Sequence, residues 1–154
     1  MDMKYFKLEQ DKRIPYGVLL TGLEAIHGYY EYRKGNDTIL EHSFTSFVNS
    51  SVVNFYPDIL DRQIFIVKCV VKDVIDIFLP EVEYKFCCLI DEPNNIYEQY
   101  LIPMLYTVDI KTGIASGHHI FRNKETEGIE VIASLEFVEA LLRRKPMGCR
   151  VVSI

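Results

Sequence analysis

The stretch that decides the fold is IEVIASLEFVEALLRRKPMGCRVVSI, residues 129–154. It begins and ends in β-rich runs, at Ile129–Val131 and Val151–Ile154. Between them, four apolar residues recur at helical spacing: Leu135, Val138, Leu141 and Leu142. This change of apolar period is typical of a strand, a short amphipathic helix and a second strand.

The predicted helix carries signals at both of its ends. Ser134 is suited to cap the N-terminus, because a serine hydroxyl accepts a hydrogen bond from a free backbone amide of the first turn. The basic run Arg143–Lys145 falls in the last turn, where positive charge complements the helix dipole, and Pro146 and Gly148 follow it. We therefore expect the helix to start after Ser134 and to stop before Pro146.

A weaker copy of this pattern lies 64 residues earlier in the chain. Phe65-Ile66-Val67 aligns with Ile129-Glu130-Val131, and Phe86–Ile90 aligns with Arg150–Ile154. Four apolar residues align with those of the C-terminal helix: Val71, Val74, Ile77 and Phe78. The earlier helix is expected to stop at Pro80. The chain is therefore predicted to contain two strand-helix-strand units.

Three further segments have the composition of strands. They are Met3–Leu8, the aromatic-rich Ile96–Ile110 and His118–Arg122. Pro103 indicates that the long strand lies at an edge or contains a bulge. The polar residues 123–127 predict a hairpin that joins His118–Arg122 to Gly128–Ala133.

Together these elements predict an α+β fold, with one mixed, largely antiparallel sheet and short helices packed on it. We treat residues 1–154 as a single domain. The C-terminal 95 residues carry the clearer pattern, whereas the pattern between Gly22 and Ser51 is poor, so residues 1–55 and 56–154 are treated as two portions of this domain. In that N-terminal portion, Tyr29, Tyr30 and Tyr32 fit a buried strand edge.

Composition limits the class of protein. Of the 154 residues, 49% are hydrophobic and 25% are charged, as in an ordinary globular domain. No run approaches the roughly 18 apolar residues of a membrane helix. The charged segment Met1–Gln10 lacks the apolar core of a secretory signal. We expect a cytoplasmic protein that is neither disordered nor inserted in a membrane.

The net charge of −5 is unevenly distributed along the chain. Residues 41–110 carry four basic and eleven acidic side chains, a net charge of −7, whereas residues 111–154 carry +2. An acidic segment repels the phosphates of nucleic acids. We therefore expect no nucleic-acid partner.

Cysteine spacing and glycine motifs give no sign of a metal or cofactor site. The four cysteines form no C-x-x-C pair, and in a reducing cytosol they are expected to be small buried hydrophobes: Cys69, Cys87, Cys88 and Cys149. The chain lacks G-x-G-x-x-G, the P-loop, H-E-x-x-H and G-x-S-x-G. We expect neither a metal nor a cofactor.

One cluster has the residue types of a catalytic site: Gly117-His118-His119-Ile120-Phe121-Arg122. Two histidines can serve as general acid and base, and an arginine can hold an anion during phosphodiester cleavage. In a strand, however, His118 and His119 point to opposite faces and share neither a substrate nor a metal. We expect one histidine at the sheet face, the other exposed, and Arg122 in a surface ion pair.

From Tyr56 to Ile154 the chain resembles a bacterial family of small proteins, once catalogued as a domain of unknown function and now treated as immunity proteins of polymorphic toxin systems. The segments that carry the resemblance are Tyr56-Pro57-Asp58-Ile59-Leu60, Ile64-Phe65-Ile66-Val67, the strand around Tyr100–Asp109, His119-Ile120-Phe121-Arg122, and Ile129-Glu130-Val131-Ile132 with its closing helix. The resemblance implies a cytoplasmic, non-catalytic protein that binds and neutralises a cognate toxin domain.

The acidic middle of the chain suggests where such a partner binds. Asp91 and Glu92 lead into the turn former Pro93-Asn94-Asn95, which predicts a projecting loop between two strands. An acidic surface can steer toward and occupy the basic active site of a nuclease-type toxin. We therefore predict that Asp91, Glu92 and Glu98 bind the partner.

Two alternatives stay open at this point. The first is a small hydrolase or nuclease that uses His118, His119 and Arg122. The second is a domain that binds a small ligand in an apolar pocket.

Overall fold

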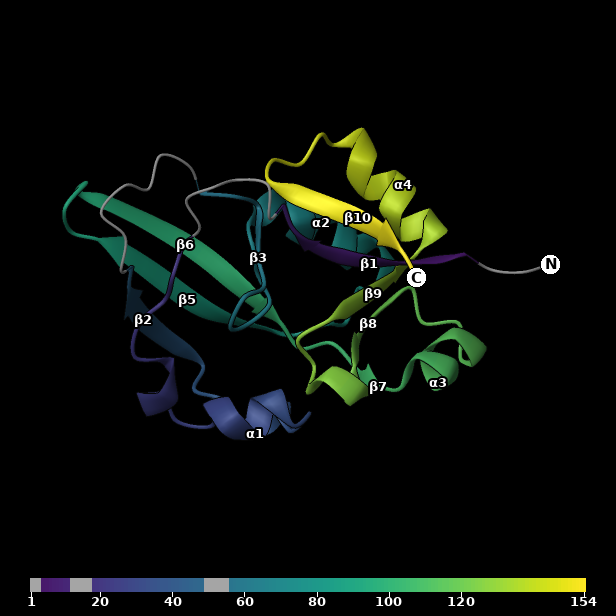
Figure 1. The fold of residues 1–154 in the computed structure, drawn as a ribbon, viewed down its shortest axis with the longest axis horizontal. Coiled ribbons are helices and arrows are strands. Elements are labelled where there is room, and N and C mark those ends of the chain that lie inside the picture. Colours follow the sequence, from purple (N-terminus) through teal and green to yellow (C-terminus); the bar gives the residue numbers. More distant parts are fainter. Residues whose placement is uncertain (1–3, 12–17, 49–55) are drawn as a thin grey trace.

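A computed structural model describes residues 4–11, 18–48 and 56–154 (Figure 1). Met3, the first residue of the predicted N-terminal strand, lies outside these ranges. The described residues form ten strands: β1 (Tyr5–Gln10), β2 (Ser43–Phe47), β3 (Ile59–Leu60), β4 (Ile66–Val67), β5 (Tyr84–Asp91), β6 (Ile96–Pro103), β7 (Thr107–Val108), β8 (Ile120–Asn123), β9 (Val131–Ser134) and β10 (Cys149–Ser153). They also form four α-helices: α1 (Tyr29–Arg33), α2 (Cys69–Phe78), α3 (Ile110–Ala115) and α4 (Leu135–Arg143).

The strands lie in two five-stranded sheets. The first sheet has the order β10-β1-β9-β8-β7, and the second has the order β2-β5-β6-β4-β3. Strand pairs are antiparallel in both sheets except for β2–β5 and β7–β8, which are parallel. The α+β class is therefore confirmed, together with its mixed and largely antiparallel pairing.

The expectation of one sheet is wrong, because the segment expected as a single strand over Ile96–Ile110 is broken. β6 ends at Pro103, which has no amide hydrogen to continue a ladder. The chain then crosses from the second sheet to the first, where Thr107 starts β7. The proline thus marks the point at which the chain changes sheets.

Both strand-helix-strand units are present, and each encloses a third strand. In the unit β4-α2-β5, strand β6 lies between the two outer strands and runs antiparallel to both. In the unit β9-α4-β10, strand β1 takes the same place. Each unit is therefore a split βαβ arrangement, and the two units repeat one architecture.

The repeat spacing of 64 residues is not the one that the helices follow. Helix α2 begins at Cys69 and α4 at Leu135, so the helices are 66 residues apart. At a spacing of 64, Ile77 aligns with Leu141, but Ile77 is 59% exposed and Leu141 is fully buried. Ile75, which is also fully buried, is the structural counterpart of Leu141.

The two helices pack on each other and close a core that both sheets share. Val71 and Ile75 of α2 lie in the same apolar cluster as Phe137 and Leu141 of α4. Side chains of both sheets belong to it as well: Leu8, Ile59, Val67, Leu101, Ile120, Val131 and Ala133. The hydroxyl of Ser134 accepts a hydrogen bond from the Phe137 amide, which confirms the predicted helix cap.

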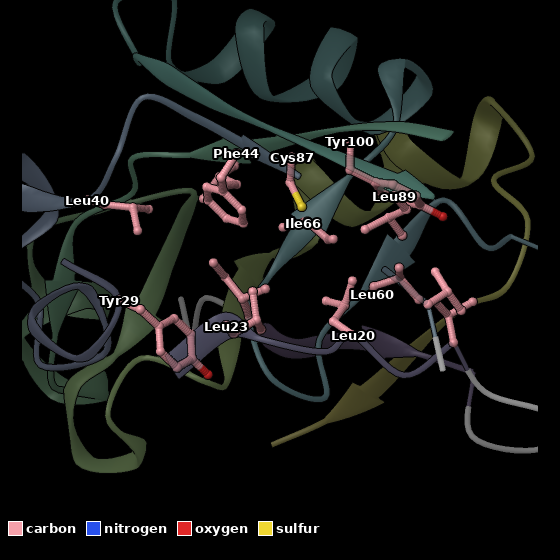
Figure 2. Packing of buried hydrophobic residues seen from close by; sticks show 14 of the residues in the cluster. Leu20, Leu23, Tyr29, Leu40, Phe44, Leu60, Ile66, Cys87, Leu89 and Tyr100 are labelled. Carbon is pink, nitrogen blue, oxygen red and sulfur yellow. The ribbon is translucent and has the colours of Figure 1, made fainter. Parts of the chain in front are cut away.

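A second core covers the other face of the second sheet, called here its inner face (Figure 2). Leu23 and Tyr29, from the N-terminal portion, lie across this core from Phe44, Cys87 and Tyr100 of the sheet (Figure 2). The tyrosine-rich segment, expected to be a strand edge, is instead the short helix α1. Tyrosines at positions 29 and 32 are buried and the one at 30 is exposed, so the segment forms a lid over the sheet.

The shared core predicts a sharp contrast between two adjacent leucines of α4. Leu141 is fully buried and Leu142 is 53% exposed. Replacing Leu141 by Ala leaves a cavity, so Leu141→Ala should lower the free energy of unfolding by about 2–5 kcal/mol. Leu142→Ala should change it by less than about 0.5 kcal/mol. Urea unfolding followed by circular dichroism measures both values, and equal losses would contradict this orientation of α4.

Candidate functional site

The predicted loop between two strands is present, as the turn that joins β5 to β6. Residues 92–95 form this turn, and Asn95 adopts a positive φ of 52°. The hairpin extends away from α2 and α4, to the left in Figure 1. Its acidic residues therefore lie at one end of the molecule.

Asp91, however, is not an exposed carboxylate. The residue is only 1% exposed, and its side chain accepts hydrogen bonds from the Tyr56 hydroxyl at 2.7 Å and the Asn94 amide group at 2.9 Å. These bonds, that from Asn94 above all, hold the pKa of the Asp91 carboxyl below its usual range. Asp91 shares the inner face with Leu89, so strand alternation turns it inward. Its predicted exposure is wrong.

The other two residues predicted to bind the partner, Glu92 and Glu98, differ in exposure and in their contacts. Glu92 is exposed in the turn. Glu98 is half-buried, and its carboxylate lies 3.4 Å from the Lys68 ammonium group. Lys68 also donates a hydrogen bond to the Tyr56 carbonyl at 3.0 Å and lies over the ring of Tyr100. Glu98 therefore belongs to a local ion pair, and Glu92 is the free carboxylate of the three.

The two histidines of the predicted cluster contact different elements. The ring of His118 stacks on that of Tyr106, with centroids 4.7 Å apart. His119 places Nδ1 2.8 Å from the Ser134 hydroxyl and packs against Phe78 of α2. The two rings do not converge on one point. Both histidines precede β8, which starts at Ile120, and both are partly buried, so the expectation that one of them is exposed is wrong.

Arg122 is buried, so its interpretation as a surface ion-pair partner is wrong. It is 1% exposed, and its guanidinium lies 3.7 Å from the centre of the Tyr32 ring. Its Nε donates to the Gly128 carbonyl at 3.1 Å, and Nη2 donates to the Tyr32 carbonyl at 2.7 Å. A side chain at Gly128 would collide with this guanidinium. Arg122 thus joins β8 to α1 and does not lie with the histidines.

The contact between His119 and Ser134 escaped the sequence analysis. A hydroxyl within hydrogen-bond reach of an imidazole has the form of an activated nucleophile. Here the serine is fully buried, and its oxygen already accepts the Phe137 amide hydrogen of the helix cap. The pair therefore positions α4 and β8 relative to each other. The feature of the sequence that could have indicated the His119–Ser134 contact is the predicted hairpin, because its two strands place His119 opposite Ser134.

Of the four cysteines expected to be buried, Cys87 is buried, Cys88 and Cys149 are partly buried, and Cys69 is exposed. Burial raises the pKa of Cys87 to about 12 and that of Cys149 to about 11, so both thiols are protonated at neutral pH. Cys69, in contrast, is exposed, because it occupies the first turn of α2 on the side away from the core. Among the described residues, no group of His, Cys, Asp or Glu side chains is arranged to hold a metal ion.

A row of exposed apolar side chains crosses the second sheet near the hairpin. Strand pairing places Phe47 beside Ile90 and Ile90 beside Tyr97. Phe47 is 49% exposed and Tyr97 is 68% exposed. With their neighbours on the same side they form what we call the open face: Thr45, Phe47, Cys88, Ile90, Tyr97 and Gln99.

The open face exists because helix α2 covers only part of this side of the sheet. α2 packs over the end of the sheet that holds Val67 and Leu101, which are buried. The hairpin end extends beyond the helix (Figure 1). None of the six side chains of the open face is charged, and Glu92 lies at its edge. An uncharged, aromatic centre with a charged rim is the usual composition of a protein-binding surface.

Comparison with family models and with curated sequences identifies no relative. No protein-family model matches the chain, and no curated protein sequence matches it significantly. Within the described ranges, no helix has the length and apolar character needed to cross a bilayer. The resemblance to toxin-immunity proteins therefore stays a prediction drawn from the order of residues.

The bonds to Asp91 predict a pH-dependent contribution to stability. Because its folded-state pKa is lowered, the contribution is fully present above the unfolded-state pKa of about 3.9 and is lost as the pH falls through the folded-state value. Asp91→Asn should lower the thermal midpoint at pH 6, and the gap from the unmodified protein should narrow toward pH 3. Glu92→Gln, the adjacent control, should leave the midpoint unchanged at both pH values. A gap that widens on acidification would contradict the assignment.

Proposed function

We propose that this protein is a non-catalytic immunity protein of the bacterial cytoplasm, which neutralises a cognate toxin domain by binding it through the open face and Glu92. The observation that carries the proposal is the row formed by Phe47, Ile90 and Tyr97, whose two outer side chains are exposed. The resemblance over residues 56–154 supplies the class of partner, and the geometry of the hairpin supplies the surface.

The aromatic side chains of the row have the character of binding hot spots. Tyrosine is enriched among residues whose removal costs an interface most, and such residues lie at its centre, surrounded by contacts that exclude water. Tyr97 and Phe47 flank the half-buried Ile90 on a regular sheet, so their backbone positions are fixed before binding. A preformed surface avoids much of the entropy cost of association.

Electrostatics supports a basic partner. Residues 41–110 have a net charge of −7, and this range includes β2, β5, β6 and the hairpin turn. Glu98 is neutralised locally by Lys68, whereas Glu92 lies exposed at the rim. A rim carboxylate acts mainly on the rate of encounter, and its effect depends on salt. The basic substrate-binding site of a nuclease-type toxin would complement this charge.

If the toxin binds the open face, substitutions on this face should lower the affinity for the toxin, whereas substitutions of exposed apolar residues elsewhere should not. The double variant Phe47→Ser with Tyr97→Ser should weaken toxin binding by about 4 kcal/mol, since hot-spot residues cost about 2 kcal/mol or more each. The control is Ile77→Ser with Leu142→Ser, two equally exposed apolar residues on α2 and α4. Surface plasmon resonance against the toxin domain encoded beside this gene measures both. Equal affinities for the two double variants would contradict the proposal.

The same toxin also tests the absence of catalysis. A binding immunity protein should inhibit in a 1:1 titration, with no inhibition beyond the molar amount added. Inactivation of toxin in excess over the protein, lost in His118→Ala with His119→Ala, would instead support the hydrolase alternative.

The exposed position of Glu92 predicts that reversing its charge changes the rate of association with the toxin. Glu92→Lys should slow association at low ionic strength and flatten its dependence on salt, while dissociation changes little. Glu136→Lys, a reversal at an exposed glutamate of α4, is the matched control. Stopped-flow kinetics at two ionic strengths gives both rates. If Glu92→Lys associates as fast as the control at low salt, the acidic rim plays no part in steering.

A further inference from the structure

A cavity of about 460 Å³ opens where the chain crosses between the two sheets. Its walls come from the C-terminal end of α2, the connection to β5 and the connection from β6 to β7. The lining residues that matter here are Phe78, Glu81, Val82, Glu83, Met104 and Tyr106. The site lies at the Tyr84 end of β5, whereas the open face and Glu92 lie at the other end.

Two aromatic rings contribute to this lining, those of Phe78 and Tyr106, and each packs against a histidine. Tyr106 is 60% exposed, and its ring stacks on His118 with an interplanar angle of 24°. Phe78 is partly buried, and its ring centre lies 4.7 Å from that of His119. The contacts fix both rings without filling the cavity. The two adjacent histidines thus position the two aromatic rings of the cavity.

The backbone around the cavity is also fixed. The Met104 amide donates a hydrogen bond to the Glu83 carbonyl at 2.9 Å, and the Val82 amide donates to the Leu79 carbonyl at 3.1 Å. The first bond ties the α2–β5 connection to the residue that follows β6, and the second closes a turn within that connection. The side chains of Val82 and Met104 thereby supply a preformed apolar surface beside the two rings.

The charge at the cavity is negative and uncompensated. Glu81 and Glu83 are exposed, and in the described part of the chain neither forms an ion pair. The neighbouring Lys85 donates its ammonium hydrogen to the Leu40 carbonyl on the inner face of the sheet. Lys72 of α2 is paired with Asp76 at 2.6 Å. Neither lysine neutralises the glutamates that line the cavity.

From this arrangement we infer that the cavity binds an organic cation, a guanidinium or ammonium group at the end of an aliphatic chain. The cation lies over the exposed ring of Tyr106, because the face of an aromatic ring attracts positive charge. Phe78, which also packs against His119 and Phe137, adds apolar surface to the wall. Glu81 and Glu83 supply the opposite charge at the opening. The aliphatic stem packs on Val82 and Met104. The inference concerns a second site and does not depend on the open face or on any toxin.

Chemical-shift titration of ¹⁵N-labelled full-length protein tests the inference, with the amides of Val82 and Met104 as reporters. A capped Gly-Arg-Gly tripeptide and agmatine present the same guanidinium from a polypeptide and from a free small molecule. Both should give saturable shifts, and the tighter of the two identifies the source of the cation. A capped tripeptide with citrulline in place of arginine is neutral and of the same shape, so it should bind at least about 10-fold more weakly, a difference of about 1.4 kcal/mol.

The variants separate charge from shape. Glu81→Gln with Glu83→Gln should weaken binding of the arginine tripeptide about 10-fold or more, and Tyr106→Leu should do the same through loss of the ring face. Glu136→Gln with Glu139→Gln, two exposed glutamates of α4, is the matched control and should bind as the unmodified protein does. Equal binding of the citrulline tripeptide, unchanged binding by the Glu81/Glu83 variant, or no saturable shift with either cation would overturn the inference.

Discussion

Burial of α2 against α4 is the contact on which the two halves of this molecule depend. Each helix belongs to a split strand-helix-strand unit, and an isolated unit of this kind leaves one helix face without cover. Val71 and Ile75 on one side and Phe137 and Leu141 on the other remove those faces from water together, within a cluster that includes strands of both sheets. Because the hydrophobic gain scales with apolar area removed from water, neither half buries its helix as well alone.

The N-terminal portion covers the apolar side chains on the opposite side of the second sheet, which would otherwise be exposed to water. The inner face of that sheet is covered by the segment that contains α1, and Arg122 ties this segment to β8 of the first sheet. A buried guanidinium is costly unless its donors are satisfied. Here the stack on Tyr32 and the bonds to two carbonyls satisfy it. With that side of the sheet closed, the hairpin end of the other side carries the exposed apolar side chains Phe47 and Tyr97.

Local signals in the sequence were sufficient for the elements whose ends are chemically marked. Ser134 caps α4, and the stretch from Asp91 to Asn95 forms the expected turn. Each of these rests on contacts within a few residues. The cap and the turn could therefore be predicted from the residues that form them. Pro103 was expected to indicate an edge strand or a bulge, but it ends β6, which lies between β5 and β4.

Long-range contacts were not accessible in the same way. Arg122 meets Tyr32 across 90 residues, and no local pattern indicates that pairing. β5 is apolar on both faces, so alternation alone did not show whether Asp91 or Ile90 faced the core. For the same reason the exposure of the open face could not be predicted from the sequence, since Phe47 and Tyr97 are equally suited to a buried strand. Which of two apolar faces stays exposed is decided by α2, and therefore by the tertiary fold.

The place of β1 has a consequence for the order of events during synthesis. In the second sheet the enclosed strand, β6, follows its unit directly along the chain, whereas in the first sheet Tyr5 must pair with Ser134 and Phe6 with Ser153. A ribosome adds about 5–20 residues per second, so β1 emerges on the order of ten seconds before either partner strand exists. During that interval the β4-α2-β5-β6 half can assemble, while β1 waits with both of its edges unpaired. A nascent chain of this protein thus presents, for that interval, a strand whose backbone groups are unpaired on both edges, and the charges of Lys7 and Glu9 on this strand oppose edge-to-edge association.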